Sequence, residues 1–95
     1  MRVISKARLR EFWIHHPQAE VALVAWYKVA THAEWKSIVE VRTAYPHADA
    51  VGALTVFNIG GNDFRLVTHM RYEWQTVFIR WIGTHAEYSK GRWRA

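Results

Sequence analysis

Hydrophobic residues follow a helical period in the first half of this chain and a strand period in the second half. From Ala19 to Ala30 the apolar positions recur every three or four residues, which predicts an amphipathic helix. After that the period becomes two, as in β-strands. Three strands are predicted, over Thr55–Ile59, Asp63–Arg71 and Thr76–Gly83. This order of elements predicts an α+β domain.

Shorter elements complete the prediction. Arg2–Ile4 is a strand candidate, and Ser5 stands where a helix N-cap belongs, before a helix over Lys6–Ile14. A short third helix is predicted over Ile38–Ala44, since the following Tyr-Pro pair disfavours helix. The stretch His47–Ala53 is predicted to be a loop.

Strand register decides which side chains share a face of the sheet. If both hairpin loops contain an even number of residues, antiparallel pairing leaves one face entirely apolar. That face holds Phe57, Ile59, Phe64, Leu66, Met70, Val77, Ile79 and Trp81. The second face holds Asn58, Arg65, His69, Arg71 and Arg80, together with Val56, Val67, Phe78 and Ile82. We expect helices on the first face and a basic surface on the second.

Composition narrows the class of protein. The 95 residues predict a single domain over 1–95, and the 51% apolar content argues against disorder. Without cysteine, neither disulfides nor thiolate metal sites can form. No apolar run approaches ~18 residues, and the basic N-terminal segment lacks the apolar core of a secretory signal. We therefore expect a cytoplasmic protein with no membrane contact.

Charge points to an anionic partner. The net charge is +5, and nine of the thirteen basic residues are arginine. Arginine presents a planar fork that matches phosphate, whereas lysine is a hydrated point charge. The alternative is that the charge only serves solubility.

Two strand arginines are candidates for phosphate chemistry. Metal-free RNA cleavage uses the neighbouring 2′-hydroxyl as nucleophile and needs proton transfer and stabilisation of a phosphorane. Arg65 and Arg80 lie mid-strand among apolar neighbours, where they would clamp the phosphate. The alternative is two solvated strand arginines.

The segment Thr84–Tyr88 offers proton carriers. Thr84 and Glu87 fit a capping box, so Glu87 is also compatible with a purely capping role. His85 and Tyr88 lie three residues apart and share a face of the turn. Either would move a proton, although Tyr88 is equally compatible with a core aromatic. Thr31–Glu34 has the same capping form.

Other polar residues are weaker candidates. Lys36 lies at the entry to the third helix, and His69 lies on the basic face as a contact residue. No spacing typical of zinc sites occurs, so neither a metal nor a cofactor is expected. Among the tryptophans, Trp13, Trp26 and Trp81 are predicted in the core, and Trp93 falls in a cationic tail.

Three sequence segments resemble the HigB family of bacterial toxins, which is related to the RelE superfamily. They are Val56–Asn62, Phe64–Leu66 and Phe78–Tyr88. The resemblance implies a RelE-like fold, with two or three N-terminal helices packed on one face of a small antiparallel sheet. It implies cleavage of mRNA on the 70S ribosome and neutralisation by a HigA-type helix-turn-helix antitoxin, with operator DNA contacted only through that antitoxin. Carried over by position, the expected RNA-facing residues are Asn58, Asn62, Arg65, Arg80, His85 and Tyr88, with Lys36 as a further candidate.

One position departs from the family pattern. Ser89 stands where family members often carry aspartate after the tyrosine. Two alternatives to the ribonuclease therefore stay open. One is a non-catalytic RNA or ribosome binder, and the other is a structural subunit of a toxin–antitoxin repressor complex.

Overall fold

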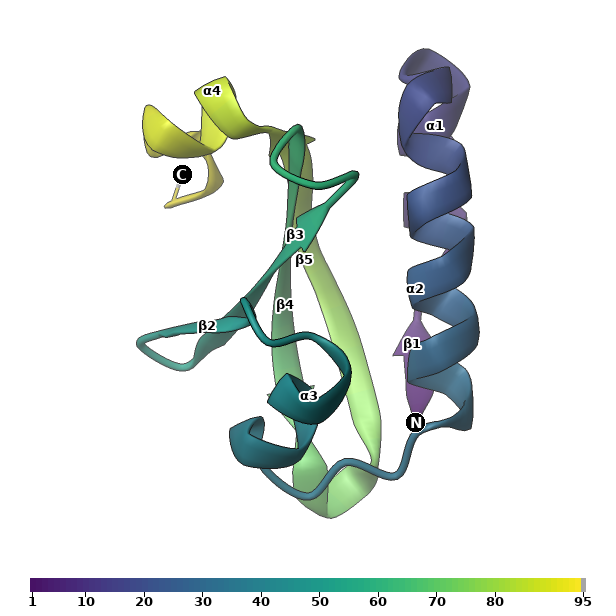
Figure 1. The fold of residues 1–95 in the computed structure, drawn as a ribbon, viewed down its shortest axis with the longest axis vertical. Coiled ribbons are helices and arrows are strands. Elements are labelled where there is room, and N and C mark those ends of the chain that lie inside the picture. Colours follow the sequence, from purple (N-terminus) through teal and green to yellow (C-terminus); the bar gives the residue numbers. More distant parts are fainter. Residues whose placement is uncertain (95) are drawn as a thin grey trace.

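A five-stranded sheet runs through the centre of the computed structural model, which describes residues 1–94 (Figure 1). The strand order is β1-β5-β4-β3-β2. Their bounds are β1 Arg2–Ile4, β2 Asp49–Val51, β3 Leu54–Ile59, β4 Phe64–Arg71 and β5 Thr76–Thr84. Pairing is antiparallel except between β1 and β5, which are parallel.

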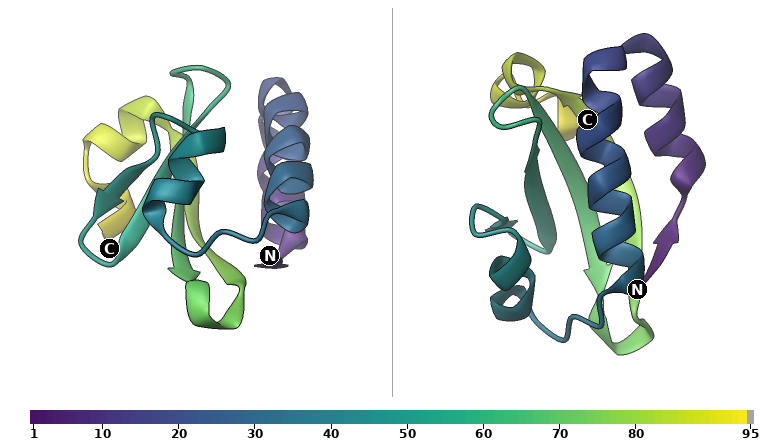
Figure 2. Two further views of the ribbon diagram at one scale, coloured as in Figure 1. Left: turned by 60° about the horizontal axis from the view of Figure 1, so that its bottom comes forward. Right: turned by 45° about the vertical axis from the view of Figure 1, so that its right-hand side comes forward.

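Helices lie on both sides of this sheet. Their bounds are α1 Lys6–His15, α2 Glu20–His32, α3 Ile38–Ala44 and α4 His85–Ser89, with short 3₁₀ turns at Pro17–Ala19, Tyr72–Trp74 and Arg92–Arg94. The helices α1 and α2 run side by side over one face, whereas α4 and the C-terminal turn lie on the other, called here the distal face (Figures 1 and 2). This confirms the predicted α+β, RelE-like architecture.

The core is centred on Phe57 of β3. Its ring meets Trp26 and Tyr45 edge to face, each at 5.4 Å between centroids, and Trp35 at 6.4 Å. Trp26 belongs to α2, and α3 reaches the same core through the fully buried Val41. The aromatic contacts therefore join α2, the loop before α3 and the C-cap residue of α3 to one strand. The predicted core position of Trp26 is confirmed, and Trp13 packs against the core while half-buried.

The predicted strand register is confirmed in part. Both hairpin loops, 60–63 and 72–75, contain four residues, the even count that was expected. However, Val67 faces Trp81 while Thr68 faces Ile79, so Arg80 is an extra residue in a β-bulge. An extra residue reverses the alternation beyond it. Consequently Ile82 packs on the core and Trp81 lies on the distal face, opposite to the prediction for both.

Arg8 of α1 supports the bulge from the edge of the sheet. The short β1 pairs with β5 only as far as Phe78. Beyond that point β5 would leave backbone carbonyls unpaired, which exposes a sheet edge. The guanidinium of Arg8 donates to the carbonyl oxygens of Ile79 at 3.1 Å and Arg80 at 3.3 Å. Arg8 thereby satisfies the backbone where the bulge begins.

Two local predictions were wrong. The stretch His47–Ala53 is not wholly a loop, because Asp49–Val51 forms β2 and pairs with β3 around a turn at Gly52, whose φ is +60°. Thr31–Glu34 is not a capping box. The helix α2 continues to His32, and the Thr31 hydroxyl donates to the Tyr27 carbonyl at 2.9 Å. A threonine hydroxyl that donates to a carbonyl in the preceding turn of its own helix is not placed to cap a following helix.

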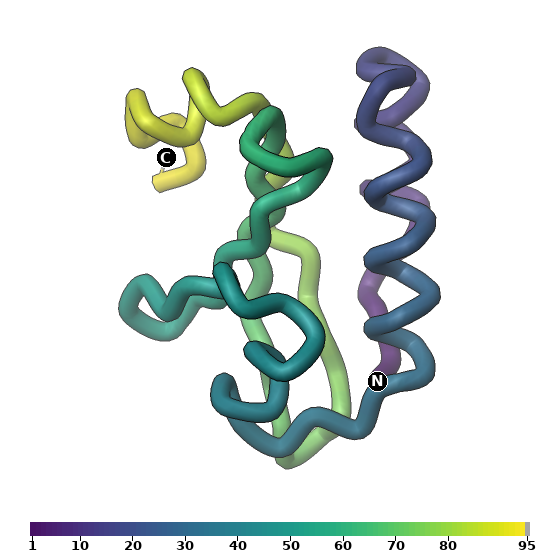
Figure 3. Tube along the Cα trace, in the orientation of Figure 1, coloured from purple at the N-terminus to yellow at the C-terminus, as the bar shows by residue number. Residues whose placement is uncertain are grey.

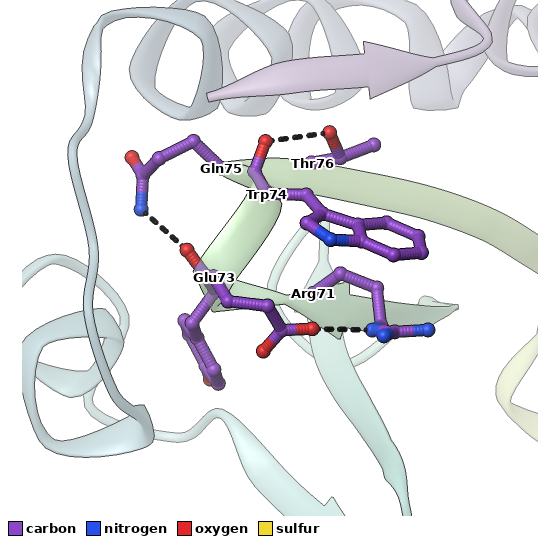
Figure 4. A network of polar contacts seen from close by, with 6 residues as sticks. Arg71, Glu73, Trp74, Gln75 and Thr76 are labelled. Carbon is purple, nitrogen blue, oxygen red and sulfur yellow. Dashed lines mark hydrogen bonds and ion pairs between the residues drawn. The ribbon is translucent and has the colours of Figure 1, made fainter.

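The β4–β5 turn closes without glycine or proline (Figure 4). Gln75 adopts the left-handed conformation with φ of 49°, and its amide nitrogen donates to the carbonyl oxygens of Trp35 and Tyr72. Nearby, Arg71 donates to the Glu73 carboxylate at 2.6 Å and lies 3.9 Å from the Trp74 ring centre. Side-chain bonds therefore fix the even loop that sets the register of β5.

We expect Phe57→Ala to lower the free energy of unfolding by about 3–5 kcal/mol, because it removes the ring shared by three aromatic neighbours. Urea denaturation measures this loss. Val21→Ala is the control, since Val21 is 84% exposed on α2 and its loss should change stability by less than ~0.5 kcal/mol. Equal effects of the two changes would contradict this assignment of the core.

Candidate active site

A buried arginine marks the candidate site on the distal face. Arg65 of β4 is only 8% exposed. Its guanidinium donates to the Asn62 side-chain oxygen at 2.6 Å and to the carbonyls of Asn62 at 3.2 Å and Phe64 at 3.0 Å. Within residues 1–94 the single ion pair joins Arg71 and Glu73, so Arg65 forms no ion pair, although Asp49 lines the same hollow. Arg65 therefore presents a fixed positive charge.

Arg65 lies in a hollow, called here the Arg65 hollow. Its volume of about 580 Å³ falls in the ~300–1,000 Å³ range typical of ligand sites. The lining residues are Arg42, Pro46, His47, Ala48, Asp49, Val56, Asn58, Arg65 and Tyr88. Pro46, His47, Ala48 and Asn58 also line an adjoining hollow that includes Asn62. The site thus combines two guanidinium groups, amides, one imidazole, one phenol and the carboxylate of Asp49.

Three lining residues that sequence reasoning did not select come from α3, the loop after it and β2: Arg42, His47 and Asp49. Arg42 donates through Nε to the Ala48 carbonyl at 2.9 Å, and the Ala48 amide donates to the Tyr45 carbonyl at 3.0 Å. These bonds hold His47 against the hollow. Loops on a rigid scaffold often carry function, but nothing local in the sequence placed this loop beside Asn58.

Tyr88 is held over Arg65 by α4 and the following turn. The Thr84 hydroxyl accepts from the Glu87 amide and the Glu87 carboxylate accepts from the Thr84 amide, so the predicted capping box is present. The Tyr88 ring stacks on Trp93 at 5.2 Å with 13° between planes, and lies 6.0 Å from the Arg65 guanidinium. Tyr88 is therefore a distal-face residue and not a core aromatic.

His85 occupies the next hollow along this face. It shares that hollow with Asn62, Asp63, Thr84, Ala86 and Ser89. The His85 amide donates to the Asp63 carbonyl at 2.9 Å, which ties α4 to the β3–β4 turn. Asn62 accepts a hydrogen bond from Arg65 and also lines the hollow of His85. His85 therefore lies beside the Arg65 hollow without lining it. Ser89 thus shares its hollow with an acidic residue, Asp63.

Three predicted site residues lie elsewhere. Arg80 lines a separate hollow with Val51, Gly52, Leu54, Trp93 and Arg94. Lys36 lies beside Glu34, Tyr72, Glu73 and Gln75 near the β4–β5 turn. His69 packs against Phe78 at 6.4 Å. The fold therefore gathers Asn58, Asn62, Arg65 and Tyr88, with His85 adjacent.

Comparison with known proteins identifies the family. The family described as HigB toxin, a RelE-like toxic component of a toxin–antitoxin system, matches residues 19–91. The chain is 31% identical over 93 residues to the mRNA interferase HigB of Escherichia coli O6:H1, covering 95% of this chain and 90% of the relative. The mRNA interferase toxin HigB of Escherichia coli K12 is 31% identical over 93% of this chain and 88% of its own length.

This chain belongs to the HigB toxin family. The Arg65 hollow lies within the matched segment, since every residue that lines it falls between 19 and 91. In this HigB-family toxin, no helix of residues 1–94 is long and apolar enough to cross a membrane. Across the same residues, no group of three or more His, Cys, Asp or Glu side chains is placed to hold a metal.

Two pKa shifts bear on the chemistry of this HigB-family site. Burial raises the pKa of the Tyr45 phenol above its ordinary value, so Tyr45 stays neutral at physiological pH and is unsuited to act as a base. The hydrogen bond from the Thr84 backbone amide lowers the pKa of Glu87, so Glu87 stays ionised. Glu87 thus serves as a charged cap that orients α4.

Gly83 is needed because the Trp81 ring lies over it. A β-carbon added at Gly83 would overlap that ring. We expect Gly83→Ala to lower the free energy of unfolding by about 1–3 kcal/mol, the usual cost of overpacking. In a Trp81→Ala background the same change should cost at least ~1 kcal/mol less, because the obstructing ring is gone and only Glu87 Oε1, at 3.0 Å from the added carbon, stays close. A double-mutant cycle by urea denaturation measures the coupling, and an equal cost in both backgrounds would refute the contact.

Proposed function

We propose that this toxin is an mRNA interferase, a ribosome-dependent endoribonuclease that inhibits translation by cleaving mRNA. Its HigB relatives from Escherichia coli are mRNA interferases, which supports this proposal. The observation that carries it is Arg65, a nearly buried guanidinium without an acidic partner in residues 1–94, at the base of a hollow. Because an unneutralised buried charge is costly, its retention favours an anionic ligand such as a phosphodiester.

The proposed reaction is a transesterification within RNA. The 2′-oxygen attacks the adjacent phosphorus, the bond from phosphorus to the 5′-oxygen breaks, and the products are a 2′,3′-cyclic phosphate and a 5′-hydroxyl. One proton leaves the 2′-hydroxyl and one is delivered to the 5′-oxygen. Arg65, with Arg42, stabilises the extra negative charge of the phosphorane. Asn58 and Asn62 donate to phosphate or base edges beside it.

Proton transfer is assigned to the polar groups around Arg65. His47 and Tyr88 both line the Arg65 hollow, and imidazole exchanges protons near neutral pH. His85 lines the hollow that it shares with Asn62 and Ser89. It would transfer a proton if the leaving group of the RNA extends past Asn62. The path of RNA across these two hollows decides which of His47, Tyr88 and His85 acts as base and which acts as acid.

The partner proposed for this toxin is an antitoxin of the HigA type with a helix-turn-helix. Membership of a toxin–antitoxin family implies an antitoxin. A helix-turn-helix would bind operator DNA, so this toxin would reach DNA only through its partner. Its basic distal face would then remain dedicated to RNA.

Arg65→Lys should reduce the rate of single-turnover cleavage of ribosome-bound mRNA by about 10²-fold, because a lysine ammonium replaces a planar guanidinium whose donors pair with two phosphate oxygens. Thermal melting should change little, since lysine keeps one donor for the Asn62 oxygen. Arg10→Ala is the matched control, as Arg10 is an exposed residue on α1, away from the distal face. Normal cleavage by a folded Arg65→Lys variant would remove Arg65 from the site. No cleavage by the wild type would favour the non-catalytic binder suggested by Ser89.

Cleavage should persist in EDTA once ribosomes are stabilised by polyamines, because the proposed chemistry uses only the RNA 2′-hydroxyl and protein side chains. The measurement compares single-turnover rates with and without chelator on the same ribosome preparation. Activity that disappears and returns with one added divalent ion, on a substrate free of ribosomes, would contradict the metal-independent mechanism.

A further inference from the structure

A second basic hollow lies on the distal face, away from Arg65. Its lining residues are Val51, Gly52, Leu54, Arg80, Trp93 and Arg94. None of them is acidic, and within residues 1–94 neither arginine forms an ion pair. Arg94 instead lies 4.5 Å from the centre of the Trp93 ring. Two neighbouring guanidinium groups, with no acidic side chain among the described residues that line the hollow, favour an anionic ligand.

The walls of this hollow suit one nucleotide unit. Guanidinium forks match phosphate oxygens in bidentate geometry. Val51 and Leu54 are apolar, and Trp93 supplies an aromatic surface on which bases of single-stranded nucleic acid stack. The bulge that places Arg80 here is a feature common beside active sites, where it redirects a side chain. This hollow therefore offers complementary groups to both the phosphate and the base of one nucleotide.

The two hollows are joined by stacked rings. Tyr88 lines the Arg65 hollow, Trp93 lines the second, and their rings stack at 5.2 Å. Along β3, Leu54 belongs to the second hollow and Asn58 to the first. Four residues of strand span roughly 13 Å. Because one phosphate group is much smaller than this span, an anion that occupies both hollows has to be extended, as a chain of nucleotides is.

We propose that Arg80, Trp93 and Arg94 form a second nucleotide subsite, which holds a nucleotide flanking the scissile phosphodiester in single-stranded RNA. This inference rests on the proposed function for the identity of the ligand. Arg80 is thereby a binding residue for the flanking phosphate and not a group at the reacting phosphorus. The subsite lengthens the footprint of the toxin on RNA without adding to the chemistry at Arg65.

The test measures binding of uncleavable 2′-O-methyl RNA by fluorescence anisotropy, with a dinucleotide and a hexanucleotide as probes. The variant Arg80→Ala/Arg94→Ala should weaken hexanucleotide binding at least 5-fold and leave dinucleotide binding unchanged. Because this variant removes two cations that would bind phosphate, the slope of log affinity against log salt should become shallower by about 1.4. The matched control is Arg2→Ala/Arg10→Ala, which removes the same charge from exposed sites on β1 and α1 and should affect neither probe.

Photo-crosslinking provides a measurement on the unaltered protein. A hexanucleotide that carries 4-thiouridine should crosslink to the peptide containing Trp93, located by mass spectrometry. The inference is overturned if the wild type binds neither probe, if the double variant behaves like its control, or if no crosslink falls at the C-terminal turn. Failure of the proposed function has a different signature. The wild type would then show the length-dependent binding and the crosslink, yet leave ribosome-bound mRNA uncut.

Discussion

The β-bulge at Arg80 is the constraint on which the rest of the distal face depends. By adding one residue to β5, it turns Ile82 toward the core and Trp81 away from it. Trp81 then covers Gly83, where any side chain would collide with its ring. The path of the chain after Gly83 leads into α4, and α4 carries Tyr88 to Arg65. Arg8 holds the bulge in place by satisfying the carbonyls of Ile79 and Arg80.

Arg65 shows how the fold accommodates a charge that serves a ligand. Its guanidinium is nearly buried, and such burial is costly without compensation. The compensation comes from neutral oxygens of Asn62 and Phe64, which satisfy the donors but leave the net charge in place. A carboxylate in ion-pair contact would instead have neutralised the group that phosphate needs. The arrangement fits a site that gives up some stability in order to hold a preorganised cation.

The C-terminal turn extends this basic character along the distal face. Figure 3 shows the chain turning back on itself after α4. Trp93 and Arg94 of this last described segment line one hollow with Val51, Gly52 and Leu54 of the β2–β3 hairpin. The Trp93 indole donates to the Tyr88 carbonyl at 3.2 Å while its ring stacks on Tyr88. Trp93 therefore orders the turn and Tyr88 together, and Arg94 rests on the Trp93 ring. A tail that is cationic in sequence becomes part of a shaped surface through these contacts.

Periodicity in the sequence was sufficient to predict the helices, the three long strands and the even hairpin loops, since each depends on neighbours in the chain. The sequence segments Val56–Asn62 and Phe78–Tyr88 were sufficient to indicate the HigB family, to which the chain belongs. Only tertiary structure decided the sides on which Trp81 and Ile82 lie, because a bulge follows from pairing between strands and leaves no local signal. Tertiary structure also brought Arg42 and His47 beside Arg65 and moved Arg80 to its own hollow. Those placements depend on β2 folding back against β3 and on contacts between residues far apart in the chain, which residue spacing along one segment does not encode.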